Sequence, residues 1–185
     1  VEVADEGRFT ARAVILAPDC TTDSWDNPTS EADTLAVLDH VQTSYGLDSA
    51  RPLIMGYSMG GIRTWYMAAR HQDRFSAALP ISARPQPDSA EAPWRIPLYV
   101  IHSRGDELFH LETTETALSQ IRARGGQAKI AILESITHYE IDRFVAPLRA
   151  AVPWIQRCWR QGQSFASSEG LSWDCDLGAD TLLEF

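Results

Sequence analysis

Short apolar segments alternate with longer amphipathic segments along most of this chain. Several apolar runs have the length of a β-strand and are hydrophobic throughout, which is typical of strands buried on both faces of a parallel sheet. The segments between them carry apolar residues at helical spacing, as Leu35, Leu38 and Val41 illustrate. For this first helix we expect Ser30 as the N-cap and Gly46 as the C-terminal stop. The predicted strands are residues 12–18, 52–57, 76–82, 98–102 and 129–135, and the predicted helices are residues 30–46, 59–71, 112–126 and 140–160.

This alternation predicts an α/β fold: a three-layer, mostly parallel sheet with helices on both faces, in a single domain of residues 1–185. In such sheets the ligand lies at the C-terminal ends of the strands, so reactive residues are expected directly after each strand. The proline-rich stretch 84–97 is expected to be a loop. Residues 162–185 carry no clear period, and we expect an irregular C-terminal tail there.

The charge balance narrows the class of partner. Sixteen basic residues against 25 acidic residues give a formal net charge of −9. This argues against binding nucleic acid or an anionic membrane surface, both of which attract clustered lysine and arginine. No apolar run approaches the roughly 18–20 residues that span a bilayer. We therefore expect a soluble protein, either cytoplasmic or exported with its signal removed, that acts on a small molecule.

The cysteines offer little chemistry. Cys20, Cys158 and Cys175 form no C-x-x-C pair, and their spacing to histidines fits no zinc site. A disulfide between Cys158 and Cys175 is one interpretation, and buried or free thiols are the other. We predict no metal site.

The segment Gly56-Tyr57-Ser58-Met59-Gly60 fits the G-x-S-x-G pattern between a predicted strand and a predicted helix. In this context the pattern indicates a serine nucleophile on a tight, strained turn. We expect the two glycines to pack against each other, so that a Cβ at either position would clash. The turn would place the Met59 amide at a helix N-terminus, where it can donate to an oxyanion. The competing interpretation is a glycine-rich turn with a capping serine.

A serine nucleophile needs a general base at neutral pH. Among the five histidines, His138 follows the last predicted strand, on a loop at the expected catalytic edge. It is our candidate for the base. His110, near the start of a helix, is the weaker rival, and His102, which ends a strand, is expected to be structural.

The third member should orient the imidazole and stabilise its charged form. Asp106 lies in the loop directly after the strand 98–102, and Glu107 is the neighbouring alternative. The order Ser58, Asp106, His138 is the one expected for an α/β-hydrolase.

With these residues in place, the chain resembles a serine esterase of the α/β-hydrolase fold. It is most similar to the phospholipase/carboxylesterase-like group and to the related predicted peptidases and polyhydroxybutyrate-depolymerase-like esterases. The resemblance implies hydrolysis of carboxylic esters through an acyl-enzyme on Ser58, without metal or organic cofactor. The dienelactone-hydrolase branch typically carries cysteine at the nucleophile position, so Ser58 weakens that option. The resemblance rests on "LAPDC…W" (16–25), "GYSMGGIRTWYMAARHQDRFSAALPIS" (56–82), "HSRGDE" (102–107) and "ITHYE" (136–140).

The chain departs from the family's pattern at its beginning. The family places a His-Gly loop after an earlier strand, where it supplies the second oxyanion donor, and residues 1–13 contain nothing similar. We therefore expect the N-terminal strands to be missing, as in a shortened domain, or replaced by another element or subunit. A missing central strand would expose a sheet edge, and for this reason a homodimer is a hypothesis.

The substrate is less constrained than the reaction. The short 84–97 loop leaves little room for a large lid, which favours short-chain, soluble esters. Tyr57, beside the nucleophile, and Trp25, in the loop after the first strand, are substrate-binding candidates, although Trp25 would serve equally well as a cover for the core. The same triad would also serve a peptidase, a thioesterase or an acyltransferase. A non-catalytic or truncated α/β-hydrolase scaffold is the alternative of another class.

Overall fold

A computed structural model describes residues 14–18 and 27–165, with side chains placed up to residue 158. The chain divides into two compact units, Val1–Leu47 and Asp48–Phe185. The described part of the first unit contains one helix, α1 (Pro28–Tyr45).

Both ends of α1 have a clear local cause. Gly46 follows the helix with a left-handed φ of 58°, which confirms the predicted stop. The N-cap is Asn27, not Ser30, because the Asn27 side chain accepts a hydrogen bond from the Ser30 amide at 3.0 Å. Pro28, with its φ already helical, occupies the first turn. The helix therefore begins two residues earlier than predicted.

The strand predicted at residues 12–18 is wrong for the part that is described. Residues 14–18 have no regular secondary structure, and Ile15 is 79% exposed. An apolar run becomes a strand only where a neighbouring strand completes its backbone hydrogen bonds. Among the described residues, the paired strands all belong to the second unit.

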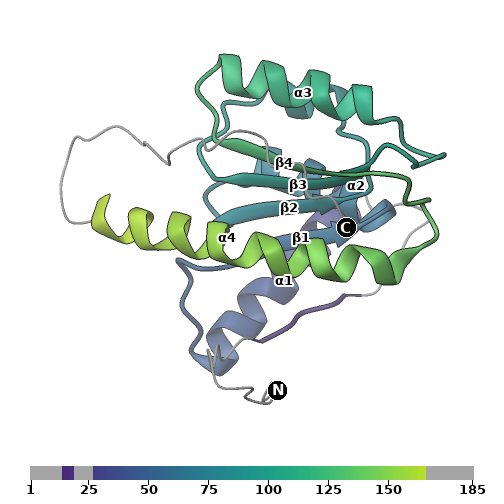
Figure 1. The fold of residues 1–185 in the computed structure, drawn as a ribbon. Helices are drawn as coiled ribbons and strands as arrows, with labels where there is room; N and C mark the ends of the chain where they lie inside the picture. Colours follow the sequence, from purple (N-terminus) through teal and green to yellow (C-terminus); the bar gives the residue numbers. More distant parts are fainter. Residues whose placement is uncertain (1–13, 19–26, 166–185) are drawn as a thin grey trace, which may run out of the picture. The chain divides into compact units, whose positions relative to one another are not determined.

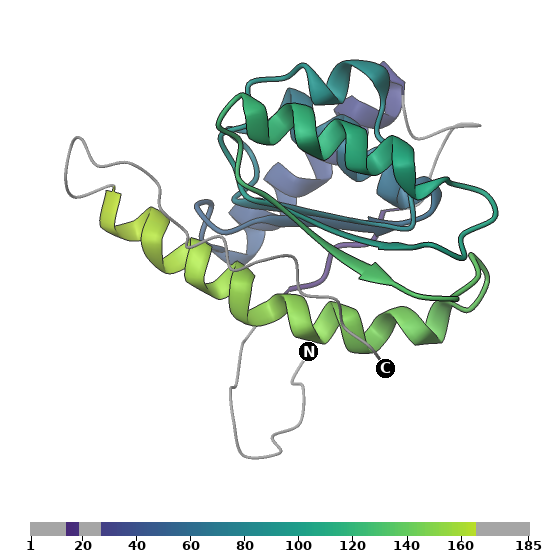
Figure 2. The same cartoon turned by 45° about the horizontal axis from the view of Figure 1, so that its top comes forward.

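The second unit is a parallel sheet with helices on both faces, and this confirms the predicted fold class. The strands follow one another across the sheet in chain order, β1-β2-β3-β4, with every neighbouring pair parallel (Figure 1). The elements are β1 (Leu53–Tyr57), α2 (Met59–Arg70), β2 (Ala77–Ile81), the 3-10 helix η1 (Pro87–Ala90), β3 (Leu98–Ser103), α3 (Leu111–Ala123), β4 (Ala128–Leu133), the 3-10 helix η2 (Ile141–Phe144) and α4 (Val145–Phe165). The helices α2 and α3, each of which connects one strand to the next, cover one face, and α4 crosses the other (Figure 2).

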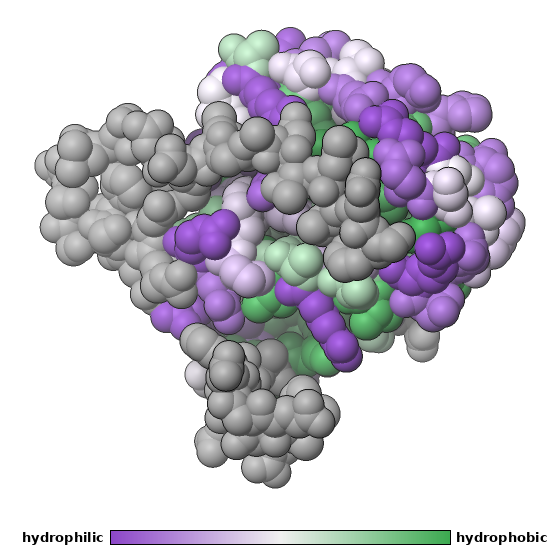
Figure 3. Space-filling model, viewed as in Figure 1, coloured by the Kyte–Doolittle hydropathy of each residue, from purple (hydrophilic) through white to green (hydrophobic). Residues whose placement is uncertain are grey.

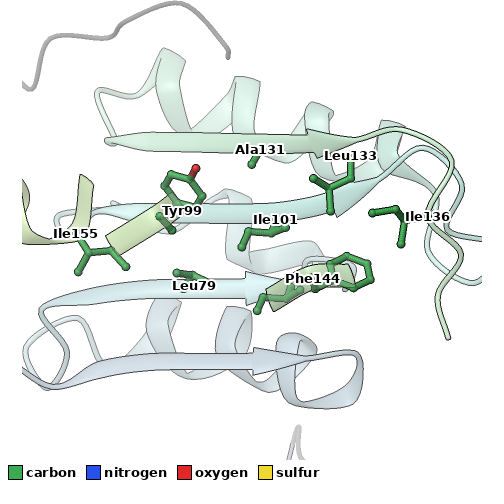
Figure 4. Packing of buried hydrophobic residues seen from close by; sticks show 10 residues of the cluster. Leu79, Tyr99, Ile101, Ala131, Leu133, Ile136, Phe144 and Ile155 are labelled. Atoms are coloured by element: carbon green, nitrogen blue, oxygen red, sulfur yellow. The ribbon is translucent and has the colours of Figure 1, made fainter. Parts of the chain in front are cut away.

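Strand alternation divides the buried residues between the two faces. Successive side chains of a strand point to opposite sides, so every second residue of β2, β3 and β4 faces α4. Each large apolar side chain that is fully buried stabilises the folded state by about 1.5–3 kcal/mol. This packing fixes the strands, and with them the loops at their ends. Figure 4 shows the cluster, which comprises Leu79, Ile81, Tyr99, Ile101, Ala131, Leu133, Ile136, Phe144, Ala151 and Ile155.

The opposite face is covered by α2 and α3, whose apolar residues recur at helical spacing. In α3 the buried positions are Leu111, Thr114, Ala117, Leu118 and Ile121. Polar residues predominate over the outer side of this helix (Figure 3). Among the described helices, none combines the length and apolarity needed to cross a bilayer.

The loop at residues 84–97 packs against the body of the second unit. Trp94 is buried, its indole N–H donates to the Ser89 carbonyl at 2.7 Å, and its ring meets Trp65 edge-on at 5.8 Å. The predicted loop therefore contains a short 3-10 helix, η1.

Candidate active site

A polar side chain follows each of the four strands, at the same edge of the sheet. Ser58 comes directly after β1 and Ser82 directly after β2, while Asp106 and His138 lie in the loops after β3 and β4. Because parallel strands end at one edge, residues far apart in sequence meet there.

The turn at Ser58 has the strained backbone expected of a nucleophile elbow. Ser58 has φ 56° and ψ −120°, which a non-glycine residue rarely adopts. A Cβ on Gly56 would overlap the Gly60 backbone, so Gly56 is required as predicted. The same expectation for Gly60 is wrong, because a Cβ there would meet nothing within 4 Å. Gly61 is the second tight position, since its Cβ would come within 2.5 Å of the Ala83 Cβ.

The three residues predicted as a catalytic triad form one hydrogen-bonded path. The Ser58 Oγ lies 2.9 Å from His138 Nε2, and His138 Nδ1 lies 3.1 Å and 3.2 Å from the two carboxylate oxygens of Asp106. His138 and Asp106 are 3% and 4% exposed. Carboxylate oxygens only accept, so this geometry assigns a proton to Nδ1 and leaves Nε2 as an acceptor for the Ser58 hydroxyl.

The two rival residues are not part of this hydrogen-bonded path. His110 is the exposed residue that precedes α3. The Glu107 carboxylate accepts a hydrogen bond from the backbone amide of His138, at 2.8 Å, and the hydrogen bonds of Nδ1 go to Asp106. His102 is fully buried, with Nε2 2.7 Å from the Phe109 carbonyl oxygen, so it closes the loop that carries Asp106.

Asp106 is held as a carboxylate by its surroundings. Burial raises the pKa of this group, but hydrogen bonds from Ser82, the Phe109 amide, His138 and the Leu108 amide outweigh burial and hold the pKa below its ordinary value of 3.8. The two amides reach the same oxygen, Oδ1, at 2.9 Å and 3.0 Å. The Ser82 hydroxyl donates to the other oxygen, Oδ2.

Ser103 joins the loop of Asp106 to the loop of His138. Its hydroxyl oxygen accepts hydrogen bonds from the amides of Gly105 and Ile136, both at 3.1 Å, and donates to the Leu133 carbonyl at 3.2 Å. Ser103 is buried at the end of β3. One side chain therefore satisfies backbone groups on both loops.

Sequence reasoning missed Ser82 and Ser103. A usable signal existed, since both lie at strand ends, where functional residues are expected. Serine is common at such positions, and only the register between β2, β3 and β4 shows what each hydroxyl contacts.

The predicted substrate-contacting and oxyanion residues are placed as follows. The Tyr57 hydroxyl donates to the His138 carbonyl oxygen, and the two rings lie 5.2 Å apart. Burial raises the pKa of Tyr57, and the negative charges of Asp106 and Glu107 raise it further. Met59 is the first residue of α2, where backbone amides have no acceptor within the helix.

Several predictions fall outside the described residues. Trp25, Cys20, Cys175, residues 1–13 and most of the C-terminal tail belong to these segments. The disulfide between Cys158 and Cys175 therefore stays a prediction. Within the described ranges, no three His, Cys, Asp or Glu side chains are grouped to hold a metal ion.

A small cavity of about 130 Å³ lies against the loop that carries Asp106. It is lined by Arg104, Asp106, His110, Leu111 and Glu112. Ligand pockets usually have about 300–1,000 Å³, so this cavity is too small for a substrate of ordinary size.

A parallel sheet with a serine elbow after one strand, and an acid and a histidine after later strands, defines the α/β-hydrolase class. Within that class the sequence matches the model of the dienelactone hydrolase family over residues 18–145, and the chain belongs to this family. The inference that Ser58 weakens the dienelactone-hydrolase option was therefore wrong at the level of the family. A single residue type at the nucleophile position does not decide membership.

Individual relatives are distant and longer. The chain is 23% identical over 86 residues to the bifunctional acetylxylan esterase/xylanase XynS20E of Neocallimastix patriciarum, covering 46% of this chain and 13% of the relative. The fold resembles esterase PE8, with a TM-score of 0.55 and 22% identity, over 66% of this chain and 60% of that one. It also resembles SOBER1 of Arabidopsis thaliana, with a TM-score of 0.57 and 18% identity, over 70% of this chain and 63% of the other. This chain thus spans less than two thirds of each.

Proposed function

We propose that this protein is a serine hydrolase that cleaves carboxylic esters through an acyl-enzyme on Ser58. The observation that carries the proposal is the unbroken hydrogen-bonded path from Ser58 through His138 to Asp106. The strained backbone of Ser58 supports it, since strain of this kind at a non-glycine residue gathers at functional sites.

The geometry supports the following acylation step. His138 Nε2, 2.9 Å from the Ser58 Oγ, takes the hydroxyl proton as Oγ attacks the acyl carbon. The ionised carboxylate of Asp106 holds the Nδ1–H tautomer and stabilises the imidazolium that forms. His138 then protonates the leaving alcohol from Nε2.

The negative oxygen that develops on the acyl carbon needs donors. The Met59 amide at the N-terminus of α2 is the first of these, because it adjoins Ser58 and has no acceptor within its helix. After the alcohol departs, water attacks the acyl-enzyme with His138 as the base, and Ser58 is regenerated.

We further propose short-chain, soluble esters as the substrates. The 84–97 loop is anchored through Trp94, which leaves no long lid among the described residues to enclose a lipid chain. The relative XynS20E is named as an acetylxylan esterase/xylanase, and acetyl is a short acyl group.

The test is turnover of p-nitrophenyl acetate and butyrate by this chain, by Ser58→Ala and by Ser135→Ala. The last is a matched control, because Ser135 is an exposed serine that also has a positive φ. We expect turnover by the wild type and the control and none by Ser58→Ala, with a fluorophosphonate label mapped to Ser58 by mass spectrometry.

The other outcomes separate the alternatives. Faster cleavage of long-chain than of short-chain esters would contradict the proposed substrate range. Labelling of Ser58 without ester turnover would point to amide or thioester substrates. The absence of both labelling and turnover would favour a binding scaffold.

We also propose that the chain forms a homodimer. Among the described strands, β1 lies at an edge of the sheet and pairs on one side only, with β2. An edge of this kind can pair with another chain. Light scattering coupled to gel filtration at micromolar concentration should give twice the chain mass, and a monomer mass would contradict the proposal.

A further inference from the structure

We propose that Ser82 is a positioning residue of this site, whose hydroxyl holds the Asp106 carboxylate in the orientation that receives the Nδ1–H of His138. The proposal rests on the serine-hydrolase function proposed above. It assigns a role to a fourth strand-end residue, which comes from β2 and is separate from the three residues of the predicted triad.

The carboxylate of Asp106 is anchored at both oxygens by different parts of the chain. Oδ1 accepts the Leu108 and Phe109 amides of its own loop, while Oδ2 accepts the Ser82 hydroxyl from the end of β2. The Ser82 Oγ also lies 3.4 Å from His138 Nδ1. Without this hydroxyl, Oδ2 would keep the His138 imidazole as its hydrogen-bond partner, with His102 Nε2 4.0 Å away, and the carboxylate plane would lose its second fixed point.

The backbone conformation of Ser82 indicates that a serine is present at this position for its hydroxyl and not for the shape of the turn. Ser82 is fully buried with a φ of 47°, in the left-handed region that favours glycine. Its amide donates to the Ile101 carbonyl at 2.9 Å, which fixes the turn at the end of β2. Glycine would satisfy this backbone with less strain, so the serine contributes its hydroxyl.

A hydroxyl donor beside Asp106 also suits the requirement that this carboxylate stay ionised. Asp106 is buried, and a buried carboxylate depends on donors to remain ionised. A hydroxyl donates one hydrogen bond to Oδ2 without introducing a competing charge. Ser82 can therefore stabilise the carboxylate and leave its bond to His138 intact.

The experiment compares Ser82→Ala with Ser82→Gly, using p-nitrophenyl butyrate. Alanine removes the hydroxyl at the same backbone conformation, whereas glycine removes the hydroxyl and relieves the strain. We expect both variants to lose kcat about tenfold to hundredfold, as for a hydrogen bond to a charged group, with KM little changed. We also expect the acidic limb of kcat/KM to move to higher pH, because the Asp106 carboxylate, with one donor fewer, would be more basic and would interact more strongly with the imidazolium.

A purely structural role predicts a different result. If Ser82 only shapes the turn, Ser82→Gly would keep the wild-type kcat and pH profile, and the proposal would be overturned. Ser135→Ala is the matched control, expected to retain the wild-type profile. Circular dichroism identifies the folded variants, and the glycine variant serves if the alanine variant does not fold.

A second measurement does not depend on turnover. Proton NMR can detect the downfield His138 Nδ1–H resonance, assigned by its loss in His138→Gln. We expect its chemical shift and its titration with pH to change in the Ser82 variants, and an unchanged resonance would contradict the proposal. If the wild type cleaves no ester, the proposed function fails, while this resonance still tests Ser82.

Discussion

The hydroxyl of Tyr57 donates a hydrogen bond to the backbone carbonyl of His138, a residue 81 positions later in the chain. Tyr57 ends β1 and immediately precedes Ser58, so this bond ties the strand of the predicted nucleophile to the loop of the predicted base. The Tyr57 ring also packs against Phe144, with ring centres 5.6 Å apart. The residue expected to contact substrate therefore has a structural partner at the site itself.

Removing the hydroxyl in Tyr57→Phe tests this link. We expect the free energy of unfolding to fall by about 0.5–1.5 kcal/mol, the usual contribution of one hydrogen bond. We also expect a loss of kcat of a few fold, because the loop of His138 is held less firmly. Urea unfolding and ester turnover measure the two effects. A variant that binds substrate more weakly at full stability would instead support a substrate-contacting role.

The three glycines around Ser58 should respond differently to alanine. Gly56→Ala and Gly61→Ala would force a Cβ into the Gly60 backbone and the Ala83 side chain, and each should destabilise by about 1–3 kcal/mol or more. Gly60→Ala places its Cβ in open space inside α2, and it should be neutral or stabilise by up to about 1 kcal/mol. Thermal unfolding of the three variants decides the matter, and equal destabilisation at positions 56 and 60 would contradict it.

Ser103→Ala should be among the most damaging conservative changes in the chain. It leaves the half-buried Gly105 amide and the buried Ile136 amide without their acceptor, at a cost of about 1–3 kcal/mol for a buried orphaned group. Ser119→Ala is a matched control on the exposed side of α3, with an expected effect within about 0.5 kcal/mol. Urea unfolding compares the two, and similar stabilities would contradict the linking role of Ser103.

The stability of the fold should depend on pH through His102. Burial lowers the pKa of this imidazole, which the Phe109 carbonyl and Asp106 only partly offset. As the pH falls, His102 therefore binds a proton near its ordinary pKa of 6.5 in the unfolded chain, and only at a lower pH in the folded chain. The stability that His102 contributes is complete above that pH and is lost as pH falls toward the folded pKa.

His102→Gln keeps a donor for the Phe109 carbonyl but cannot titrate. We expect its free energy of unfolding to fall less steeply than that of the wild type between about pH 7 and 5, where one proton corresponds to at most about 1.4 kcal/mol per pH unit. Urea unfolding across this range gives both slopes. Parallel slopes in the two proteins would exclude His102 as the source.

Much of the second unit could be predicted from sequence, because its strands are continuous apolar runs. The predicted strand 52–57 is β1 (Leu53–Tyr57), and the predicted helix 59–71 is α2 (Met59–Arg70). The elbow pattern and the order of Ser58, Asp106 and His138 were sufficient to predict which residues meet. The structure places these three together, while their catalytic roles stay predictions.

The remaining features depend on tertiary geometry that periodicity does not carry. The run at 12–18 has strand composition, yet strand structure depends on a partner that local sequence does not specify. Gly60 fits the motif, but the space around a Cβ depends on the exact path of the turn. Ser82 and Ser103 resemble ordinary loop-edge serines until the sheet register brings their hydroxyls to Asp106 and to the loop of His138.

The arrangement of the strands also sets the order in which the site can be completed during synthesis. The strands occupy the sheet in chain order, and the predicted nucleophile precedes its base by 80 residues. A nascent chain therefore carries Ser58 long before the ribosome has made His138, the residue proposed to activate it. Until β4 docks and brings His138 to the edge of the sheet, Ser58 lacks its proposed base. On the proposed mechanism, the growing chain would therefore not cleave esters until the described sheet is complete.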